Sequence, residues 1–246
     1  MIIDSHVHLG RWAMPELKGL DNTMGEVGKV LGRCGIDGAV IIPSDSADNG
    51  RVMKAALSAR GRRYWFFPWV HPHMPGMMEF LESNLTGISG LKFHPSLDRT
   101  RISDRTNVGF LRFAESNRLP AMVHCGRWKE MAGYEFVLDV AERIPGLDLV
   151  CGHQGGDPPQ YKWESADEVR HRKLDNVFFD IVGTREFWTI THGIEVLGPE
   201  RYIFGSDLPL AYPSMYLAVV NEALELGRGD REKILSKNLL KLLSGK

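Results

Sequence analysis

The sequence predicts one α/β domain over residues 1–246, folded as a closed (β/α)8 TIM barrel. Eight short apolar segments with strand character alternate with helical segments along the 246 residues, and continuous apolar strands suit a parallel sheet that is covered on both faces. The length agrees with this fold, because (β/α)8 barrels commonly have about 250 residues. An open doubly wound sheet is the alternative, but no Gly-rich dinucleotide-binding turn follows the first strand.

The expected strands are short, and most are bounded by Gly, Pro or polar residues. The first strand begins the chain and lies within residues 1–10. The other seven are expected at residues 38–42, 64–70, 87–95, 119–124, 147–151, 176–182 and 201–204.

Helical spacing and capping residues separate these strands. Thr23 and Glu26 match the capping-box pattern ahead of a helix that runs to about Cys34. Further helices are expected at residues 48–60, 77–84, 103–117, 133–144, 185–197, 213–226 and 230–243, with one more inside the polar stretch 157–174.

The composition is that of an ordinary globular protein, with 43% apolar and 25% charged residues. The formal net charge of −1 gives no reason to expect a nucleic acid or an anionic membrane as a partner. Three cysteines cannot all pair with one another, so free thiols in a reducing cytoplasm are expected. The start of the chain does not resemble a signal peptide, and no apolar stretch is long enough to span a bilayer.

The first strand carries alternating polar residues. Asp4, His6 and His8 would project from the same face, because side chains at positions i and i+2 of a strand point the same way. Two imidazoles so placed can bind one metal ion. A His-x-His pair is common by chance, however, so the interpretation depends on the other strands.

Potential ligands recur where other strands end. Lys92 and His94 end the fourth strand, His124 the fifth, His153 the sixth and Asp207 the eighth. In a (β/α)8 barrel these ends meet at one mouth, where active sites lie. Three imidazoles and a carboxylate suit Zn²⁺, with Mn²⁺ or Fe²⁺ as alternatives.

Strand alternation also predicts where the buried cysteines point. Cys125 is out of phase with His124, so it should face the surrounding helices. Cys151 is in phase with His153, so it should fill a lower layer inside the barrel.

Five motifs follow one another along nearly the whole chain. They are Asp4-Ser5-His6-Val7-His8, Leu91-Lys92-Phe93-His94-Pro95, Val123-His124-Cys125-Gly126, Gly152-His153-Gln154-Gly155-Gly156 and Phe204-Gly205-Ser206-Asp207-Leu208-Pro209. The ordered set resembles the motifs of the amidohydrolase superfamily, and most closely those of its amidohydrolase-2 branch, which includes aminocarboxymuconate-semialdehyde decarboxylase. The C-terminal segment 232–243 is similar to the last helix of that branch.

The resemblance implies a role for each matching position. His6, His8, His124 and Asp207 would hold one divalent metal ion, with Zn²⁺ the first expectation. Asp207 would also handle the proton of a metal-activated water, and His153 would act beside the reacting oxygen. These two are the expected catalytic residues.

Three further residues are expected to bind substrate: Lys92, His94 and Arg127. In other branches a carbamylated lysine on the fourth strand bridges a second metal, which is less usual in this one. Lys92 could instead bind a substrate anion or pair with Asp180 inside the barrel. Arg127 follows His124 by three residues and is the first candidate for a substrate carboxylate.

These inferences predict a metal-dependent hydrolase that cleaves an amide, ester or lactone bond in a small, carboxylate-bearing molecule. A metal-dependent decarboxylase of an unsaturated or aromatic acid is the main alternative. A deoxyribonuclease of the same superfamily usually carries a glutamate at the fourth strand, where this chain has Lys92 or His94. A non-catalytic ligand-binding barrel is the remaining alternative. A homodimer is common among similar proteins.

Overall fold

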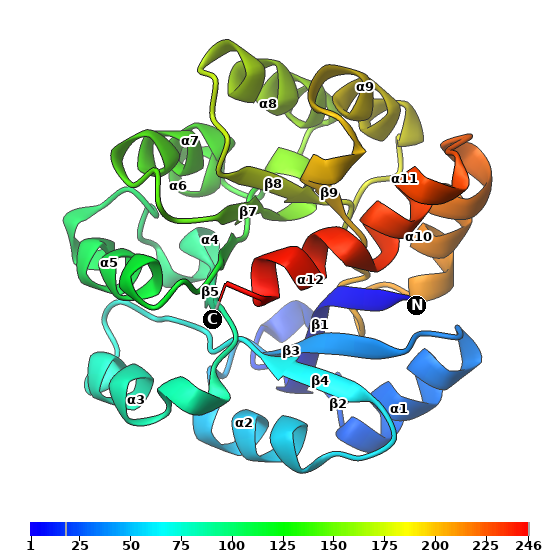
Figure 1. The fold of residues 1–246 in the computed structure, drawn as a ribbon. Coiled ribbons are helices and arrows are strands. Elements are labelled where there is room, and N and C mark those ends of the chain that lie inside the picture. Colours follow the sequence, from blue (N-terminus) through cyan, green and yellow to red (C-terminus); the bar gives the residue numbers. More distant parts are fainter. Residues whose placement is uncertain (18, 246) are drawn as a thin grey trace.

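The computed structural model describes residues 1–17 and 19–245 as a ring of strands enclosed by helices (Figure 1). Eight strands of the described chain run parallel around the ring, while the short β2 pairs antiparallel with β1. The strands are β1 Ile3–Arg11, β2 Asp21–Asn22, β3 Gly38–Pro43, β4 Arg63–Phe66, β5 Leu91–Phe93, β6 Ala121–Val123, β7 Leu149–Cys151, β8 Val177–Asp180 and β9 Tyr202–Ile203.

The strands form two arcs, β2-β1-β3-β4 and β5-β6-β7-β8-β9, which meet at two junctions. Parallel bridges pair Trp69 with Lys92 at one junction and Val7 with Leu208 at the other. These pairings close the sheet and leave no open edge within the ring. The predicted (β/α)8 barrel is confirmed, although several strands are shorter than predicted.

A buried carboxylate helps to join the first strand to the last. Asp4 Oδ1 accepts the backbone N–H groups of His6 and Ser206 at 3.1 and 3.0 Å, and Asp4 Oδ2 accepts the Ser206 hydroxyl at 2.6 Å. Burial raises the pKa of Asp4 to about 7, although these hydrogen bonds act in the opposite direction. The chain from Gly205 to Leu208 is therefore fixed against β1, next to His6 and His8.

The helices follow the strands in the predicted order. The Thr23–Glu26 capping box is present, since Thr23 Oγ1 accepts the Glu26 N–H and the Glu26 carboxylate accepts the Thr23 N–H. The helices are α1 Met24–Arg33, α2 Asn49–Ser58, α3 Met77–Ser83, α4 Pro95–Asp98, α5 Val108–Ser116, α6 Lys129–Ala132, α7 Tyr134–Arg143, α8 Pro159–His171, α9 Phe187–Leu197, α10 Pro213–Ala218, α11 Arg228–Glu232 and α12 Asn238–Leu243. None of the helices described combines the length and the apolar character that crossing a membrane requires.

The core has two layers. The larger layer lies between strands and helices, and the smaller one fills the barrel with side chains such as Ile3, Met122 and Phe178. Helix α12 crosses the middle of the ring (Figure 1), where Leu239 and Leu242 join the inner layer. The C-terminal helix thus covers the amino-terminal end of the barrel and leaves the opposite end for the site.

The cysteines correct one prediction. Cys125 and Cys151 both belong to the outer layer, between strands and helices. The prediction for Cys125 is confirmed, but that for Cys151 is wrong. Strand β7 ends at Cys151, and His153 has a left-handed backbone with φ 56°, so strand alternation does not relate the two side chains.

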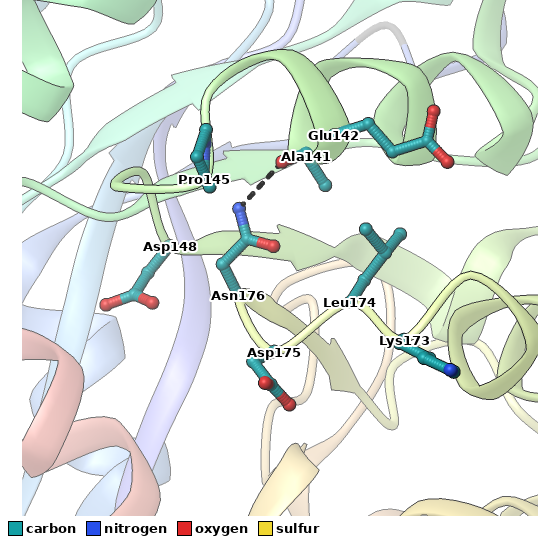
Figure 2. Close-up of a pocket in the computed structure, with 8 residues that line it drawn as sticks. All are labelled: Ala141, Glu142, Pro145, Asp148, Lys173, Leu174, Asp175 and Asn176. Carbon is teal, nitrogen blue, oxygen red and sulfur yellow. Dashed lines mark hydrogen bonds between the residues drawn. The ribbon is translucent and has the colours of Figure 1, made fainter.

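One cavity of about 470 Å³ lies beside the amino ends of β7 and β8. Asn176 lies in its wall and donates a hydrogen bond from Nδ2 to the Ala141 carbonyl at 3.2 Å (Figure 2). Asp148, just before β7, also lines this cavity. The cavity is at the end of the barrel opposite the predicted site residues, so its position gives it no part in their chemistry.

Truncation of Leu239 tests whether α12 closes the barrel. We expect Leu239→Ala to lower the free energy of unfolding by about 2–5 kcal/mol, because the side chain is only 2% exposed and its loss leaves a cavity. Lys241→Ala, on the exposed face of the same helix, should cost no more than about 0.5 kcal/mol. Urea denaturation measures both. Equal values for the two variants would contradict this account of the core.

Candidate metal centre

Three predicted metal ligands come together at the carboxyl end of the barrel. One donor atom from each of His6, His8 and Asp207 lies within 4.8 Å of the other two. Asp207 Oδ1 is 3.7 Å from His6 Nε2 and 3.4 Å from His8 Nε2. The two histidines are on β1, and Asp207 follows β9 with a left-handed backbone of φ 63°.

Hydrogen bonds fix which ring nitrogen of each histidine carries a proton. His8 Nδ1 donates to the Pro43 carbonyl at 2.7 Å, and His6 Nδ1 donates to Asp180 Oδ2 at 2.9 Å. Each Nε2 therefore carries a lone pair on the side of Asp207. Two imidazole nitrogens and a carboxylate oxygen so close together are a donor set that fits a divalent metal ion.

Lys92 is fully buried beneath the cluster. Its ammonium donates to His6 Nε2 at 3.0 Å, so a metal ion and Lys92 would compete for the same lone pair. Burial lowers the pKa of Lys92 to about 8, and the negative charges of Asp180 and Asp207 oppose that shift. The predicted pairing of Lys92 with Asp180 is indirect, because the His6 ring hydrogen-bonds both side chains.

The fourth predicted ligand, His124, is adjacent to this cluster but is not one of its three members. Its ring stacks on His94, with centroids 3.9 Å apart, and meets the edge of His153 at 4.5 Å. His124 Nε2 is buried and has no hydrogen-bond partner in residues 1–17 and 19–245. An unpartnered buried lone pair is costly, and coordination of a metal ion would satisfy it.

His94 is held in a stack of aromatic rings. Its ring lies between Trp69, at 4.9 Å and 4° from parallel, and His124. His94 Nδ1 accepts the Leu97 N–H at 3.3 Å, which assigns the ring proton to Nε2. His94 can therefore donate one hydrogen bond while it remains uncharged.

Burial keeps most of the histidines of the site neutral. The pKa values of His6, His94, His124 and His153 all lie well below the ordinary value, with burial as the largest cause and neighbouring cationic groups adding to it. For Asp207, burial raises the pKa, but its contacts with His8 and His6 and the charge of Lys92 lower it below the ordinary value. Asp207 is thus the carboxylate of the cluster that is ionised at neutral pH.

A cavity of about 360 Å³ opens above these residues. His8, His94, His124, His153 and Asp207 line it, together with the apolar side chains of Trp12, Met14, Leu17, Leu97 and Leu210. Arg127 also lies on its wall and remains 57% exposed, with Nη2 3.9 Å from Glu16 Oε1. Lys92 is not among the described residues that line the cavity, so its predicted contact with substrate stays a prediction.

The prediction assigned no role in the site to Asp180 beyond a pairing with Lys92. The Asp180 carboxylate accepts the side-chain N–H of His6 and, at 2.7 Å, the backbone N–H of His153. Burial raises its pKa to about 6, against the opposing effect of Lys92. A carboxylate at the carboxyl end of the seventh parallel strand was the only sequence signal for this role.

The fold and this site together define a class of protein. The family model described as Amidohydrolase matches residues 3–244, so the chain belongs to the amidohydrolase family. A comparison with functionally curated proteins finds no match.

Solved structures of similar fold cover nearly the whole chain. An amidohydrolase from Burkholderia multivorans with bound zinc has a TM-score of 0.78 at 14% identity, with 99% of each chain covered. A probable 2-pyrone-4,6-dicarboxylic acid hydrolase from Acinetobacter baumannii has a TM-score of 0.75 at 16% identity, with 98% of each chain covered. A dihydroxybenzoic acid decarboxylase from a Polaromonas species with bound manganese has a TM-score of 0.74 at 15% identity, covering 98% of this chain and 96% of that one.

Removal of a histidine from the cluster tests the metal centre. We expect His8→Ala to weaken Zn²⁺ binding by at least about 100-fold, because ligand loss should cost no less than the loss of an outer partner. Competition with a fluorescent zinc chelator measures the affinity. His171→Ala, at an exposed position in α8, is the matched control and should bind zinc like the wild type. Equal affinities for both variants would show that the cluster does not bind the ion.

Proposed function

We propose that this protein is a metal-dependent hydrolase that cleaves an amide, ester or lactone bond in a small molecule bearing a carboxylate. The observation that carries the proposal is the set of three lone-pair atoms, from His6, His8 and Asp207, within 4.8 Å of one another at one end of a largely apolar cavity. We propose His124 as the fourth donor, because its buried Nε2 has no partner in the described residues.

One divalent ion, Zn²⁺ in our proposal, would supply Lewis-acid activation of water and of the scissile carbonyl when bound. Asp207 is available as a proton acceptor, because a carboxylate with a pKa below the ordinary value is ionised at neutral pH, and its side chain lines the cavity and is 13% exposed. The carboxylate could pass that proton to the leaving group. Zinc is supported over manganese only by the three-histidine ligand set.

The neutral rings of His94 and His153 would orient the reacting group. His94 donates from Nε2, since its Nδ1 already accepts the Leu97 N–H. His153 lines the same cavity from the end of the sixth parallel strand. Hydrogen bonds aimed at an oxygen that gains negative charge stabilise the transition state more than the bound substrate.

We assign the substrate carboxylate to Arg127. Its guanidinium lies on the cavity wall, 3.9 Å from Glu16 Oε1 and 5.6 Å from the Trp128 ring centre, and its side chain remains 57% exposed. A planar guanidinium can hold a carboxylate through two parallel hydrogen bonds. Trp12 and Leu97 supply the apolar surface for the rest of the molecule.

A second candidate is decarboxylation of an unsaturated or aromatic acid. The observation that favours it is the apolar wall of the cavity, because a carboxylate held away from water is destabilised and loses CO₂ more readily. A planar acid would also fit beside Trp12 and Leu210. We further propose that the protein is cytoplasmic and that it forms a homodimer.

Replacement of the proposed proton acceptor tests the reaction. We expect Asp207→Asn to lower kcat by about 10²–10⁴-fold, because an amide cannot accept the proton. The substrates are a panel of carboxylate-bearing lactones, esters and amides and, separately, of aromatic and unsaturated acids. Incorporation of ¹⁸O from labelled water into the product indicates hydrolysis, and release of CO₂ indicates decarboxylation. Wild-type protein that turns over neither set would contradict both candidates.

Replacement of Arg127 tests how the substrate is held. We expect Arg127→Met to raise KM about 10- to 100-fold with a smaller change in kcat, because a charge-assisted pair with the carboxylate is worth about 1.5–3 kcal/mol. Arg99→Met is the matched control. Both guanidiniums lie 5.6 Å from the Trp128 ring centre, but Arg99 is not among the described residues that line the cavity. Equal changes in KM for the two variants would show that Arg127 does not bind the substrate carboxylate.

A further inference from the structure

We propose that Lys162 is a positioning residue for His153: together with Asp180 it holds the main chain of His153 in the conformation that presents the imidazole to the cavity. The inference rests on the proposed function only for the catalytic role of His153. The structural part, that Lys162 fixes the His153 backbone, is independent of it.

The backbone at His153 is unusual. His153 and Gln154 have φ 56° and 51°, both in the left-handed region, and neither is glycine. Such residues cost roughly 1 kcal/mol or more each and persist only where neighbouring groups hold them. His153 also packs closely, since a Cβ added at Gly183 would lie 2.9 Å from its Nδ1.

Two buried charged side chains hold opposite sides of this residue. Asp180 Oδ1 accepts the His153 N–H at 2.7 Å. Lys162 Nζ donates to the His153 carbonyl at 3.2 Å and to the Gly156 carbonyl at 2.9 Å. The two charges therefore fix the residue from the strand side and from helix α8.

Lys162 is not an ordinary surface lysine. Its side chain is only 1% exposed, although it lies near the start of α8, and its third contact is Asp157 Oδ1 at 3.6 Å. Burying a lysine is costly unless its ammonium is well satisfied. Here both hydrogen bonds of the ammonium go to the turn that carries His153. The buried Lys162 side chain therefore supports the conformation of that turn.

Asp180 and Lys162, which both hydrogen-bond the main chain of His153, differ in their other contacts. Asp180 also orients His6, a proposed metal ligand, so changing Asp180 would disturb both parts of the site. In the described chain, Lys162 makes no hydrogen bond or ion pair with His6, His8 or Asp207. A substitution of Lys162 therefore removes a hydrogen bond to the His153 carbonyl and leaves the hydrogen bonds of His6 and His8 in place.

The test is a double-mutant cycle of Lys162→Met with His153→Ala. We expect Lys162→Met alone to lower kcat about 10- to 100-fold, because a small misplacement of a catalytic group costs that much, with Zn²⁺ content unchanged. In the His153→Ala background the same change should alter kcat by no more than about threefold. An equal loss of kcat in both backgrounds would overturn the proposal. Lys54→Met, an exposed lysine in α2, controls for the substitution itself.

A structural readout keeps the result independent of the reaction. We expect hydrogen exchange of the His153 amide, measured by NMR on histidine-labelled protein, to speed up at least about tenfold in Lys162→Met, because the turn opens more often. An unchanged exchange rate would show that Lys162 does not hold the His153 backbone. If His153→Ala itself leaves kcat unaltered, the proposed catalytic role of His153 is wrong. The amide exchange rate then still tests whether Lys162 holds the His153 backbone. If Lys162→Met does not fold, Lys162→Gln replaces it in both measurements.

Discussion

The contact between the first and last strands of the barrel is the constraint on which the site depends. Asp4 and Ser206 are 202 positions apart in the chain, yet their side chains hydrogen-bond at 2.6 Å. The contact places His6 and His8 beside Asp207, so the proposed metal donors come together only when the ring is closed. Closing so long a loop is entropically costly, and the buried core of the barrel must supply the compensating free energy. Closure of the barrel and assembly of the cluster of His6, His8 and Asp207 are therefore coupled.

Inside the barrel, the His6 ring connects two buried charged side chains by hydrogen bonds. Lys92 donates to one ring nitrogen of His6, and the other ring nitrogen donates to Asp180. Burial moves the pKa values of the lysine and the aspartate toward neutrality, to about 8 and about 6. A buried cation and a buried anion linked by one imidazole cost less than either alone. A divalent ion at His6 Nε2 would displace the lysine from that nitrogen, so metal binding and the charge state of Lys92 are linked.

The sequence predicted the barrel and most of its polar mouth for a physical reason. Short apolar strands ending in polar residues leave few alternatives to parallel strands with a common polar end, and His6, His8 and Asp207 meet there. The prediction failed for Cys151, because strand alternation stops where β7 ends. It also missed the contacts of Asp180 and Lys162 with His153. Asp180 lies on the next strand, β8, and Lys162 lies nine positions after His153 in the helix that follows the turn. Neither strand alternation nor helix periodicity relates these positions to His153.

The site therefore has two parts built in different ways. His6 and His8 lie on a strand whose hydrogen bonds to its neighbours fix their direction, so the sequence pattern is enough to place them. His153 lies on a turn with a strained backbone, and charged side chains from β8 and α8 must hold it. A strand resists displacement because its whole ladder must move, whereas a turn can shift when one hydrogen bond is lost. His6 and His8, two of the proposed metal donors, thus lie on the more rigid part of the mouth. Under the proposed function, we therefore expect substitutions around the His153 turn to alter the reaction more than they alter metal binding.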